Sequence, residues 1–547
     1  MRLLVFLCLC LTLAPILSFA WLQGSLRSHA ARPRLQSCRP ALCSVENKPS
    51  WSMSVAAGSA VGIETARPSS LGLEAVGAPS PAKALAVAVV GGGPAGLATA
   101  LMLARRGYKD VTVYERLGEP PLPSSEDWDN AERSYNLGIG GRGQKALTAL
   151  GVLDRVLEWS AEAVGRKDWT PQTPDGAERI FTERKYVTKV IQRDRLASCL
   201  VQELREKQSG TVALRFGVDC HCVDWKEPGP GATLHLRDGQ TGEESVRDVG
   251  LVIGTDGVRS VVRDSMESAD ALMKAASGRR LRTVRFRETN PFVYKVVPFR
   301  LAPGWRNDFN YSHRTKEGIT LETLPTKEGM QVGVLLFRPD DERALGLKDA
   351  ADSKALFQNL FPEFAGMVSD DAYERLAKQA VSRLPTFSYA GPALHMGGSG
   401  VLLGDAIKSV KPYFGMGVNS AFEDCMTLCD CLEEEVDDLP RALALYSRRR
   451  APEAKALVEL SRGFDRTGRV GTLLFVLPLV LDTVCHKLAP RIFRPNTISF
   501  LQVDGVTFTQ VRRRKWLDRG TQAGLAGLAA WAAVAAAGTV ASRLAPL

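Results

Sequence analysis

Residues 85–116, LAVAVVGGGPAGLATALMLARRGYKDVTVYER, carry the clearest indication of the fold. Residues 85–90 form an unbroken apolar run, which is typical of a parallel strand buried on both faces. Glycines follow in the order G-x-G-x-x-G, the spacing from Pro94 to Arg106 is helical, and Val111–Tyr114 has the character of a second strand. The stretch therefore predicts a strand–loop–helix–strand unit of a doubly wound α/β fold.

The glycine loop is suited to binding a dinucleotide. Gly91 allows a tight turn, Gly93 lets the backbone approach a pyrophosphate, and Gly96 lets the helix pack on the strand. The free N–H groups at the start of the helix would face the phosphates. Glu115, about 20 residues further on, would accept hydrogen bonds from ribose hydroxyls. The pattern does not by itself distinguish FAD from NAD.

A second junction between a strand and a loop occurs in DVGLVIGTDGVRSVVRDSM, residues 248–266. We expect a strand over Gly250–Ile253, and Asp256 opens the loop that follows. Taken alone, the segment is most simply the start of a helix capped by Asp256. Its position between the glycine loop and the next motif favours a second contact with the same cofactor.

The third motif is VLLGDAIKSVKPYFGMGVNSAFEDC, residues 401–425. It begins as a short apolar strand, and we expect a helix over Ser420–Glu434. Asp405 would reach a ribityl or ribose hydroxyl. Gly415 and Gly417 would let backbone N–H groups face a flat ring or a pyrophosphate without a clash from Cβ.

In this order, the motifs resemble those of the single-component FAD-dependent aromatic hydroxylases (group A flavin monooxygenases) over about Leu85–Ser447. The segments RSYNLGIGGRGQKALTALGVLDRVLE (133–158), QRDRLASCL (192–200) and KPYFGMGVNSAFEDC (411–425) are most similar to kynurenine 3-monooxygenases. The resemblance implies FAD as cofactor, NADPH or NADH as a reductant that docks without a Rossmann domain of its own, and O2 as co-substrate. It also implies insertion of one oxygen atom into an aromatic substrate through a C4a-hydroperoxyflavin, without a side-chain nucleophile or a metal.

The resemblance also implies roles for individual residues. Arg142 would bind a substrate carboxylate, although it could instead be a solvated charge at the start of a helix. Asn419 would lie near the flavin and the substrate, and it also suits the N-cap of the following helix. Arg193 would be the arginine beside FAD. The implied cofactor-binding residues are Gly91, Gly93, Ala95, Gly96, Glu115, Arg116, Arg193, Asp256, Asp405, Pro412, Gly415, Gly417, Val418 and Asn419.

Some positions depart from the pattern of that family. Lys408 stands where the family usually has His, and Met416 where it usually has Gln. The tyrosine that family members use to hold an amino-acid carboxylate has no clear equivalent, since Val156 and Phe464 occupy similar regions. Lys408 and Lys411 are expected to add positive charge near the loop. The flavin site is left intact by these departures, whereas the identity of the substrate is left open.

Other functions therefore stay open. The first is epoxidation or hydroxylation of a plastid isoprenoid or carotenoid, and a related one is saturation of a prenyl chain without O2. A function of another class is that of a non-catalytic flavin-binding assembly subunit.

The expected fold class is α/β, with a Rossmann-like FAD-binding domain interleaved with a mixed β-sheet substrate domain. The substrate sheet would include antiparallel strands in PFVYKVVPFR, GITLETL and MQVGVLLF. C-terminal helices and a membrane-anchor helix would follow. The expected divisions are a monooxygenase region at 85–460, with FAD segments at about 85–270 and 395–460 and the sheet at about 280–394, a helical region at 461–520, and the anchor at 521–542.

The two ends of the chain indicate targeting to a membrane. Residues 1–20 have the pattern of a signal peptide, and residues 21–84, which contain only three acidic residues, that of a transit peptide or disordered leader. The pair resembles the bipartite leaders of proteins sent to complex algal plastids. The alternatives are the ER or secretory membrane and the mitochondrial outer membrane. Residues 521–542 carry no charge and suit a membrane span, which needs about 20 residues.

Composition argues against two other classes of partner. The net charge is +10, but much of the excess lies in the end regions, and we find no nucleic-acid motif with interleaved aromatic residues. Cys220-His221-Cys222 alternates along a probable strand without a second ligand pair, so we interpret it as structural and predict no metal. The expected partners are a small aromatic or isoprenoid substrate and a membrane.

Overall fold

The computed structural model describes residues 80–544, except for 127, 129–134, 183–184, 227–228, 273–280, 466–467 and 504. The predicted signal peptide and nearly all of the predicted leader lie outside the described residues. The described chain up to Lys515 forms one compact unit, whereas the part of helix α15 from Trp516 onward belongs to a second unit.

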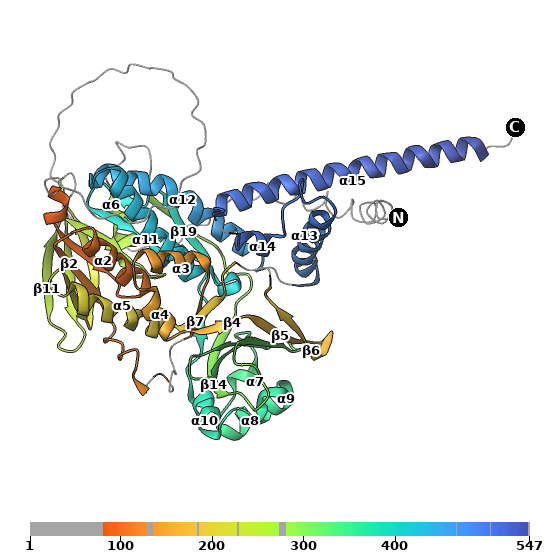
Figure 1. The fold of residues 1–547 in the computed structure, drawn as a ribbon, viewed down its shortest axis with the longest axis horizontal. Helices are drawn as coiled ribbons and strands as arrows, with labels where there is room; N and C mark the ends of the chain where they lie inside the picture. The colour runs from red at the N-terminus through yellow and green to blue at the C-terminus, as the bar shows by residue number, and fades with distance from the viewer. Residues whose placement is uncertain are drawn as a thin grey trace, which may run out of the picture. The chain divides into compact units, whose positions relative to one another are not determined.

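The FAD-type sheet of the compact unit has the strand order β20–β21–β12–β1–β2–β8. Its strand β2 is labelled beside helix α2 in Figure 1. β1 (Ala86–Val90) lies in the middle and pairs in parallel with β2 (Asp110–Glu115) and with β12 (Leu251–Gly254). β12 pairs in parallel with β21 (Gly400–Leu402), so the strands of all three motifs are neighbours in one sheet. The outer strands are β8 (Val212–Phe216) and β20 (His395–Met396).

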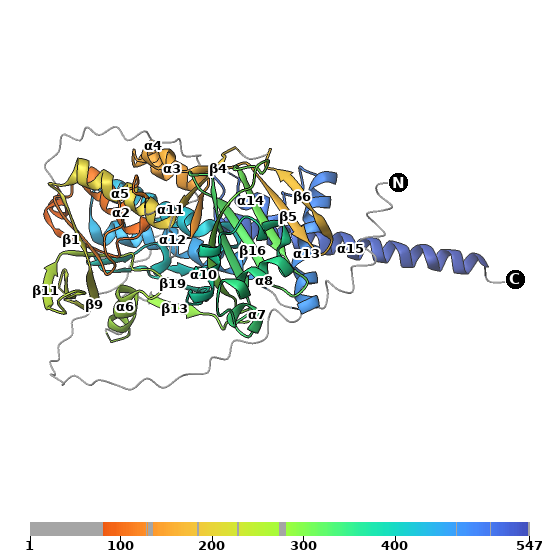
Figure 2. The ribbon, with the colours of Figure 1, turned by 90° about the horizontal axis from the view of Figure 1, so that it is seen from below.

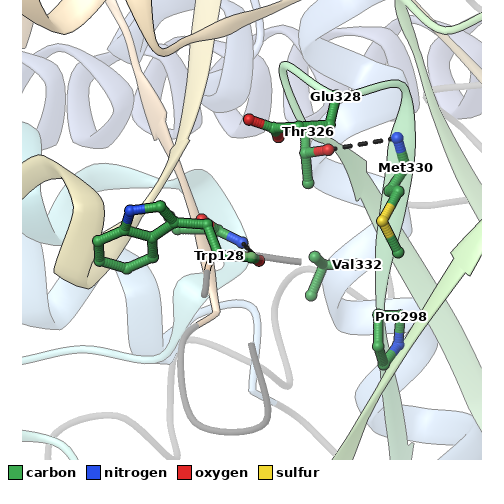
Figure 3. A pocket seen from close by; sticks show the side chains of 7 residues that line it. Trp128, Pro298, Thr326, Glu328, Met330 and Val332 are labelled. Carbon is green, nitrogen blue, oxygen red and sulfur yellow. Dashed lines mark hydrogen bonds between the residues drawn. The ribbon is translucent and has the colours of Figure 1, made fainter. Parts of the chain in front are cut away.

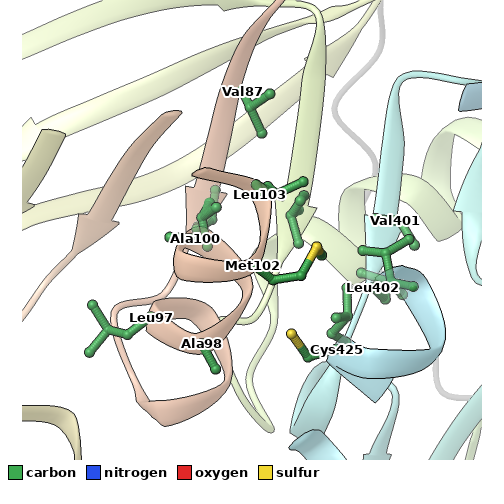
Figure 4. Close-up of a cluster of buried hydrophobic side chains, with 14 of the residues drawn as sticks. Val87, Leu97, Ala98, Ala100, Met102, Leu103, Val401, Leu402 and Cys425 are labelled. Carbon is green, nitrogen blue, oxygen red and sulfur yellow. The ribbon is translucent and has the colours of Figure 1, made fainter. Parts of the chain in front are cut away.

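A shared hydrophobic core joins the first and last motifs. Helix α2 (Pro94–Arg105) packs on β1 and β2 of this sheet, and α11 (Met416–Glu434) packs on α2. Figure 4 shows Met102 of α2 close to Leu402 of β21 and Cys425 of α11, and each of these side chains is at most 2% exposed. The free energy gained by burying apolar side chains grows with the area buried. This contact therefore stabilises the packing of segments that lie far apart in the chain.

A small antiparallel sheet flanks the FAD-type sheet. It consists of β9 (Val218–Trp225), β10 (Ala232–Asp238) and β11 (Glu244–Val249). The Cys220-His221-Cys222 run lies on β9, with Cys220 buried and Cys222 half-buried. No group of three His, Cys, Asp or Glu side chains among the described residues is arranged to hold a metal ion.

A second large sheet has the strand order β18–β14–β17–β16–β15–β5–β6. Figure 2 labels its strands β16, β5 and β6. The predicted segments form β14 (Val293–Arg300), β16 (Thr320–Pro325) and β17 (Met330–Phe337), with β17 antiparallel to both of the others. β15 (Phe309–Arg314) pairs in parallel with β5 (Gly165–Thr170). The remaining strands are β6 (Thr173–Ile180) and β18 (Ser382–Arg383).

This sheet is larger than the region 280–394 expected to form it, because β5 and β6 come from the earlier part of the chain. Short strands such as these carry no local signal for their distant partner, since pairing depends on register with β15. Helices gather on one face of the sheet (Figure 2), namely α7 (Glu342–Leu345), α8 (Ala350–Leu360), α9 (Pro362–Ala365) and α10 (Asp370–Lys378).

Shorter elements complete the compact unit. One small sheet has the order β3–β7–β4, and another has the order β13–β19–β22. Their bounds, with those of the nearby helices, are β3 (Asn136–Ile139), α3 (Gly141–Ala149), α4 (Leu153–Glu158), β4 (Ala161–Ala163), β7 (Thr188–Gln192), α5 (Arg193–Gln208), α6 (Val261–Leu272), β13 (Leu281–Arg285), β19 (Ser388–Pro392) and β22 (Lys408–Ser409).

The C-terminal region is helical, as the sequence predicted, with α12 (Leu439–Arg462), α13 (Gly468–Leu488), α14 (Thr497–Leu501) and α15 (Phe508–Leu544). Buried Phe500 of α14 and Phe508 of α15 form a core with Leu457 of α12. Within the described residues, one helix is long and apolar enough to cross a membrane, over Phe508–Ala537 of α15. The anchor expected at 521–542 overlaps this helix and stays a prediction.

Candidate active site

The glycine loop at the end of β1 has no room for side chains. Gly91 has φ +102°, and a Cβ there would lie 2.5 Å from the carbonyl oxygen of Thr255. A Cβ on Gly96 would lie 1.9 Å from the carbonyl oxygen of Gly91. The first and second motifs therefore touch through their backbones, and a larger residue at either glycine would separate them.

Glu115 closes the loop from the end of β2. Its Oε2 accepts a hydrogen bond from the N–H of Gly92 at 2.8 Å, and its Oε1 accepts one from Leu117 at 2.9 Å. The carboxylate is thereby fixed beside the glycine loop, where the sequence predicted the ribose contact. Arg116 follows with an exposed side chain.

Asp256 caps a helix in the structure, which was the simpler of its two interpretations. Its Oδ2 accepts hydrogen bonds from the N–H groups of Val261 at 2.7 Å and Val262 at 3.1 Å, at the start of α6. Its Oδ1 is buried and has no hydrogen-bond partner among the described residues. Desolvation raises the pKa of this carboxyl, and the hydrogen bond with Ser260 opposes the shift. The Asp256 backbone lies against Gly91, so the cap also shapes the glycine loop.

Asp405 lies at the meeting point of the motifs. A Cβ on its neighbour Gly404 would lie 3.3 Å from the Cβ of Ala95, so this loop touches the start of α2. The Asp405 side chain is exposed, yet desolvation by the surrounding protein raises the pKa of its carboxyl, opposed by the charges of Lys408 and Arg193. The carboxyl is therefore accessible although neighbouring protein lies close to it.

Arg193 and Tyr135 lie near Asp405. The N–H of Arg193 donates to the carbonyl oxygen of Tyr135 at 3.1 Å, and a Cβ on Gly93 would lie 3.4 Å from Nη2 of Arg193. Desolvation raises the pKa of Tyr135, and the nearby Asp405 and Tyr294 contribute to that rise. The sequence singled out Arg193 and Asp405 but not Tyr135, because a tyrosine before a short strand carries no signal of its own.

The loop after Pro412 leaves open space at the start of α11. Pro412 is exposed, and Gly415 has φ +61° and forms the N-cap of the helix. A Cβ on Gly415 or Gly417 would meet nothing within 4 Å. A flat ring could approach this backbone, and the helix N-terminus would favour negative charge on it. α11 begins at Met416 rather than at Ser420 as predicted, because Gly415 adopts the left-handed conformation that ends the loop.

Asn419 lies inside the first turn of α11 and is not its N-cap, so that alternative was wrong. Its Oδ1 accepts hydrogen bonds from the N–H groups of Gly140 at 2.9 Å and Gly143 at 3.2 Å. Its Nδ2 donates to the carbonyl oxygens of Gly138 at 2.9 Å and Gly415 at 2.7 Å. The buried amide therefore ties the segment around β3 and α3 to the loop of the third motif.

Arg142 is held by the protein itself and is not a freely solvated charge. It forms an ion pair with Glu423 of α11, and its Nη2 donates to the carbonyl oxygen of Val506. Its guanidinium also stacks on the ring of Phe508, 4.8 Å from the centroid. The predicted binding of a substrate carboxylate stays a prediction, and it would have to compete with these contacts.

Lys408, which stands where the family usually has His, is buried in a charged network. Its amine pairs with Asp424, which also accepts a hydrogen bond from the Gly404 N–H at 3.0 Å. Arg450 donates through Nε to the other carboxylate oxygen of Asp424 at 2.7 Å. Desolvation lowers the pKa of Lys408, and the Asp424 carboxylate opposes the shift. The positive charge predicted here is therefore paired, and it positions the loop next to Asp405.

Lys411 is paired in the same way. Its Nζ lies 3.0 Å from Oε1 of Glu288 and 3.0 Å from Oδ2 of Asp465, and it donates to the carbonyl oxygen of Asn290 at 2.7 Å. The Tyr413 hydroxyl also bonds Asp465. Because these partners lie far apart in the sequence, only the fold reveals the cluster.

The residues present fit bound FAD. Four parts of the site lie at or beyond the carboxyl ends of parallel strands, where such folds bind nucleotides. They are the Gly91–Gly96 loop, Glu115, Asp405 and the start of α11. Val418, also predicted for the cofactor, packs partly buried on the hydrophobic core. Glu423, Asp424 and Asp465 were missed as charge partners, although Glu423 and Asp424 stand within the third motif.

Comparison with curated proteins and a family model agrees with this geometry. A family model described as FAD binding domain matches residues 84–461. The chain is 30% identical over 420 residues to kynurenine 3-monooxygenase of Salinispora arenicola, covering 75% of this chain and 86% of that protein. It is 29% identical over 473 residues to the enzyme of the same name from Salinispora tropica, covering 82% and 96%.

Solved structures share the fold at lower identity. The tetrameric form of 2-methyl-3-hydroxypyridine-5-carboxylic acid oxygenase superposes with a TM-score of 0.54 at 21% identity, covering 75% of this chain and 99% of that one. PqsL of P. aeruginosa in complex with 2-aminobenzoylacetate superposes with a TM-score of 0.53 at 19% identity, covering 72% and 96%.

Proposed function

Because the chain belongs to the FAD-binding-domain family and to its kynurenine 3-monooxygenase-like flavin monooxygenases, we propose that it uses NAD(P)H and O2 to hydroxylate a small aromatic substrate. One oxygen atom of O2 would enter the substrate as a hydroxyl group, and the other would leave as water. Each turnover would consume one NAD(P)H and one proton. Bound FAD would supply the hydride acceptance and the activation of O2.

The observation that carries the proposal is the meeting of the three motifs at the carboxyl ends of neighbouring strands of one sheet. The helix N-terminus at Gly93 offers N–H donors for a pyrophosphate. The Glu115 carboxylate, which the Gly92 N–H holds beside the loop, would accept a hydrogen bond from a ribose hydroxyl. Asp405 is exposed in the loop after β21, and the backbone at Gly415 leaves room for a flat ring. The chain's own task is to bind, orient and shield the reacting groups, because water in such a site diverts the reaction.

The names of the similar proteins support an aromatic substrate. Kynurenine 3-monooxygenases are similar over most of this chain, and one structural neighbour was solved with 2-aminobenzoylacetate. An isoprenoid substrate is the second candidate, favoured by the apolar helix over Phe508–Ala537. Membrane attachment would bring such a substrate within reach.

The test is stopped-flow measurement of NADPH oxidation by FAD-loaded protein, with and without L-kynurenine, in air and without O2. We expect an aromatic substrate to accelerate flavin reduction and to yield a hydroxylated product that carries one atom from labelled O2. Slow NADPH oxidation that yields only H2O2 with every aromatic compound tried would contradict the proposal and favour the isoprenoid. Flavin that binds but is not reduced by NADPH or NADH would indicate the non-catalytic subunit.

We also propose attachment to a plastid membrane, supported by the composition of residues 1–84 and by the apolar helix α15. The test is expression of fluorescent fusions of the full chain and of a chain lacking residues 1–84 in an alga with complex plastids. Plastid fluorescence that needs these residues is the expected result. Fluorescence confined to the ER or to mitochondria would reject the proposal.

A further inference from the structure

The pocket between Trp128 and the second sheet is too small for a substrate. Trp128 and Gln192 line it on one side, and Pro298, Met330 and Val332 line it on the other (Figure 3). Its volume is about 10 Å³, which is roughly the space that one water molecule needs. The buried Oε1 of Gln192 has no hydrogen-bond partner among the described residues, and such a water would supply a donor to it. This pocket therefore suits a structural water.

The buried charges around Lys411 lie elsewhere, on the loop that leads into helix α11. The Lys411 side chain is fully buried, and that of Asp465 is 5% exposed. Nζ of Lys411 lies 3.0 Å from both carboxylate oxygens of Asp465 and 3.0 Å from Oε1 of Glu288. Asn290 accepts a hydrogen bond from Lys411 at 2.7 Å through its carbonyl oxygen, and its Nδ2 donates to Asp465 at 3.3 Å. One cation and two carboxylates are thus held together by three separate segments of the chain.

Asp465 also holds the residue on the other side of Pro412. The Tyr413 hydroxyl donates a hydrogen bond to Oδ1 of Asp465. Desolvation raises the pKa of Tyr413, and the hydrogen bond to Asp465 and its charge add to that rise, so the hydroxyl keeps its proton. The carboxylate therefore binds both neighbours of Pro412, and it fixes the direction of the chain through the loop.

The loop needs such a contact because its glycines give it little stiffness. Gly415 has φ +61°, and a Cβ on Gly415 or Gly417 would meet nothing within 4 Å. Glycine restricts the backbone less than any other residue does. The ends of the loop are held by Val410 and Met416, which pack on the core of α12, α14 and α15. Between these ends, Asp465 determines where the backbone runs.

Stability alone is a poor explanation for these charges. Removing charged groups from water is costly, and a buried ion pair often stabilises a fold no more than apolar side chains of similar size would. What the cluster supplies is a single geometry, because each of its hydrogen bonds has a preferred length and direction. That geometry belongs to the loop whose open backbone leaves room for a flat ring.

We propose that Asp465 is a positioning residue for bound FAD. By holding Lys411 and Tyr413, it keeps the loop over Pro412–Gly415 and the N-terminus of α11 in place for the flavin ring. The N–H groups at that end of the helix favour negative charge, which the ring gains on reduction. The inference rests on FAD binding, the property of the matched family, and goes beyond the proposed hydroxylation.

The experiment measures the midpoint potential of FAD in the full-length protein, with a chemical reductant and a redox dye, so that no turnover is needed. In Asp465→Asn we expect the preference for reduced over oxidised flavin to fall about tenfold, which lowers the two-electron potential by about 30 mV. Loss of the negative charge by itself would act in the opposite direction, because it would favour the reduced ring. A higher potential therefore contradicts the proposal.

Tyr413→Phe is the second variant, since it removes one hydroxyl and no charge. It should lower the potential by a smaller amount, and it keeps the proposal testable if Asp465→Asn fails to fold. The matched control is Asp482→Asn, because Asp482 of α13 is also a buried carboxylate, with the Nζ of Lys515 at 3.2 Å. The control should lower the midpoint of urea unfolding but leave the potential unchanged.

A second readout needs no flavin. Hydrogen–deuterium exchange of the flavin-free protein should be about fivefold faster over residues 412–419 in Asp465→Asn and Tyr413→Phe, as the loss of one hydrogen bond implies. In Asp482→Asn the exchange of these residues should be unchanged. The inference stands only if both readouts change in the variants that fold and neither changes in the control; any other result overturns it.

The proposed monooxygenase function is tested separately by turnover. If both readouts change as expected but NAD(P)H does not reduce the flavin, the positioning role stands and the monooxygenase function is contradicted. Coupled hydroxylation by a protein whose potential is the same with and without the Tyr413 hydroxyl would do the reverse.

Discussion

At the scale of single residues, the shape of the site depends on Asn419, a buried polar side chain whose amide is fully hydrogen-bonded inside the protein. Asn419, which is 3% exposed, forms hydrogen bonds with two backbone N–H groups and two carbonyl oxygens. The same residue was expected to lie near flavin and substrate. In the structure its amide organises the loops that would hold them, so its first effect is on the shape of the site.

Replacement of Asn419 by Ala should destabilise the protein by about 1–3 kcal/mol or more, because it leaves buried backbone groups without partners. The loss should appear as a lower midpoint in urea and as fewer flavins bound per chain. Asn307→Ala is the control, since Asn307 is exposed. An unchanged midpoint in Asn419→Ala would show that water replaces the amide.

His395 provides a pH dependence at the same scale. Desolvation and the nearby charge of Arg448 lower the pKa of His395 to about 4, and its Nδ1 lies 2.7 Å from the Ser447 hydroxyl. Its unfolded-state pKa is about 6.5. Between these values the unfolded chain binds the extra proton, so the free energy of unfolding must fall as pH drops from about 6.5 to about 4.

We expect this histidine to account for about 1–2 kcal/mol of the stability lost between pH 7 and pH 5, allowing for its partial exposure. Urea unfolding of His395→Gln at both pH values isolates the effect, because the variant should lose that much less than the unaltered protein. Parallel losses in the two proteins would rule out the contribution.

At the scale of elements, the glycines divide into those that pack and those that leave space. Gly96 lies where helix α2 touches the Gly91 backbone, and a Cβ there would be 1.9 Å from an oxygen atom. Gly417, in the first turn of α11, would place its Cβ in open space. Glycine therefore allows close packing of helix α2 at Gly96, and it leaves the N-terminus of α11 accessible at Gly417.

Ala substitutions should separate these two uses. Gly96→Ala should lower both the thermal midpoint and FAD binding, because the helix has to move away from the loop. Gly417→Ala should raise the stability of the flavin-free protein by about 0.5–1 kcal/mol, because Ala favours the helix, while weakening FAD binding about tenfold by filling the space of the ring. Calorimetry and FAD titration measure both quantities. Unchanged FAD affinity in Gly417→Ala would show that the ring lies elsewhere.

At the scale of the whole molecule, the described chain divides after Lys515 into the compact unit and the remainder of α15. The helix over Phe508–Ala537 is long and apolar enough to span a membrane. The start of α15, by contrast, packs in the compact unit, where Phe508 and Val511 are buried. Cleavage between these parts should therefore leave the FAD-binding region whole.

A chain that ends at residue 520 should be recovered in the soluble fraction with FAD bound, whereas the full chain should stay with membranes after carbonate extraction. The reason is that the apolar stretch beyond 520 lacks any charge up to residue 542. If the shortened chain still sediments with membranes, the exposed apolar residues of α13, such as Val470 and Val480, become the next candidates for attachment.

Elements whose structure depends on neighbouring residues could be predicted from the amino-acid sequence. The strand, glycine loop and helix over residues 85–116 are where the pattern predicted them, because φ, side-chain volume and periodicity are local properties. The antiparallel strands of the second sheet and the C-terminal helices were predicted for the same reason. The order of the motifs was also enough to identify the FAD family.

The contacts of the charged side chains could not be predicted without the fold. The addition of β5 to the second sheet places Asp168 in one row with Glu322, although they lie far apart in the sequence. The pairing of Lys408 with Asp424 and of Arg142 with Glu423 likewise depends on contacts between distant segments. The pairing and burial of a charged side chain depend on its neighbours in three dimensions. In a sheet those neighbours depend on strand register, which no local sequence pattern fixes.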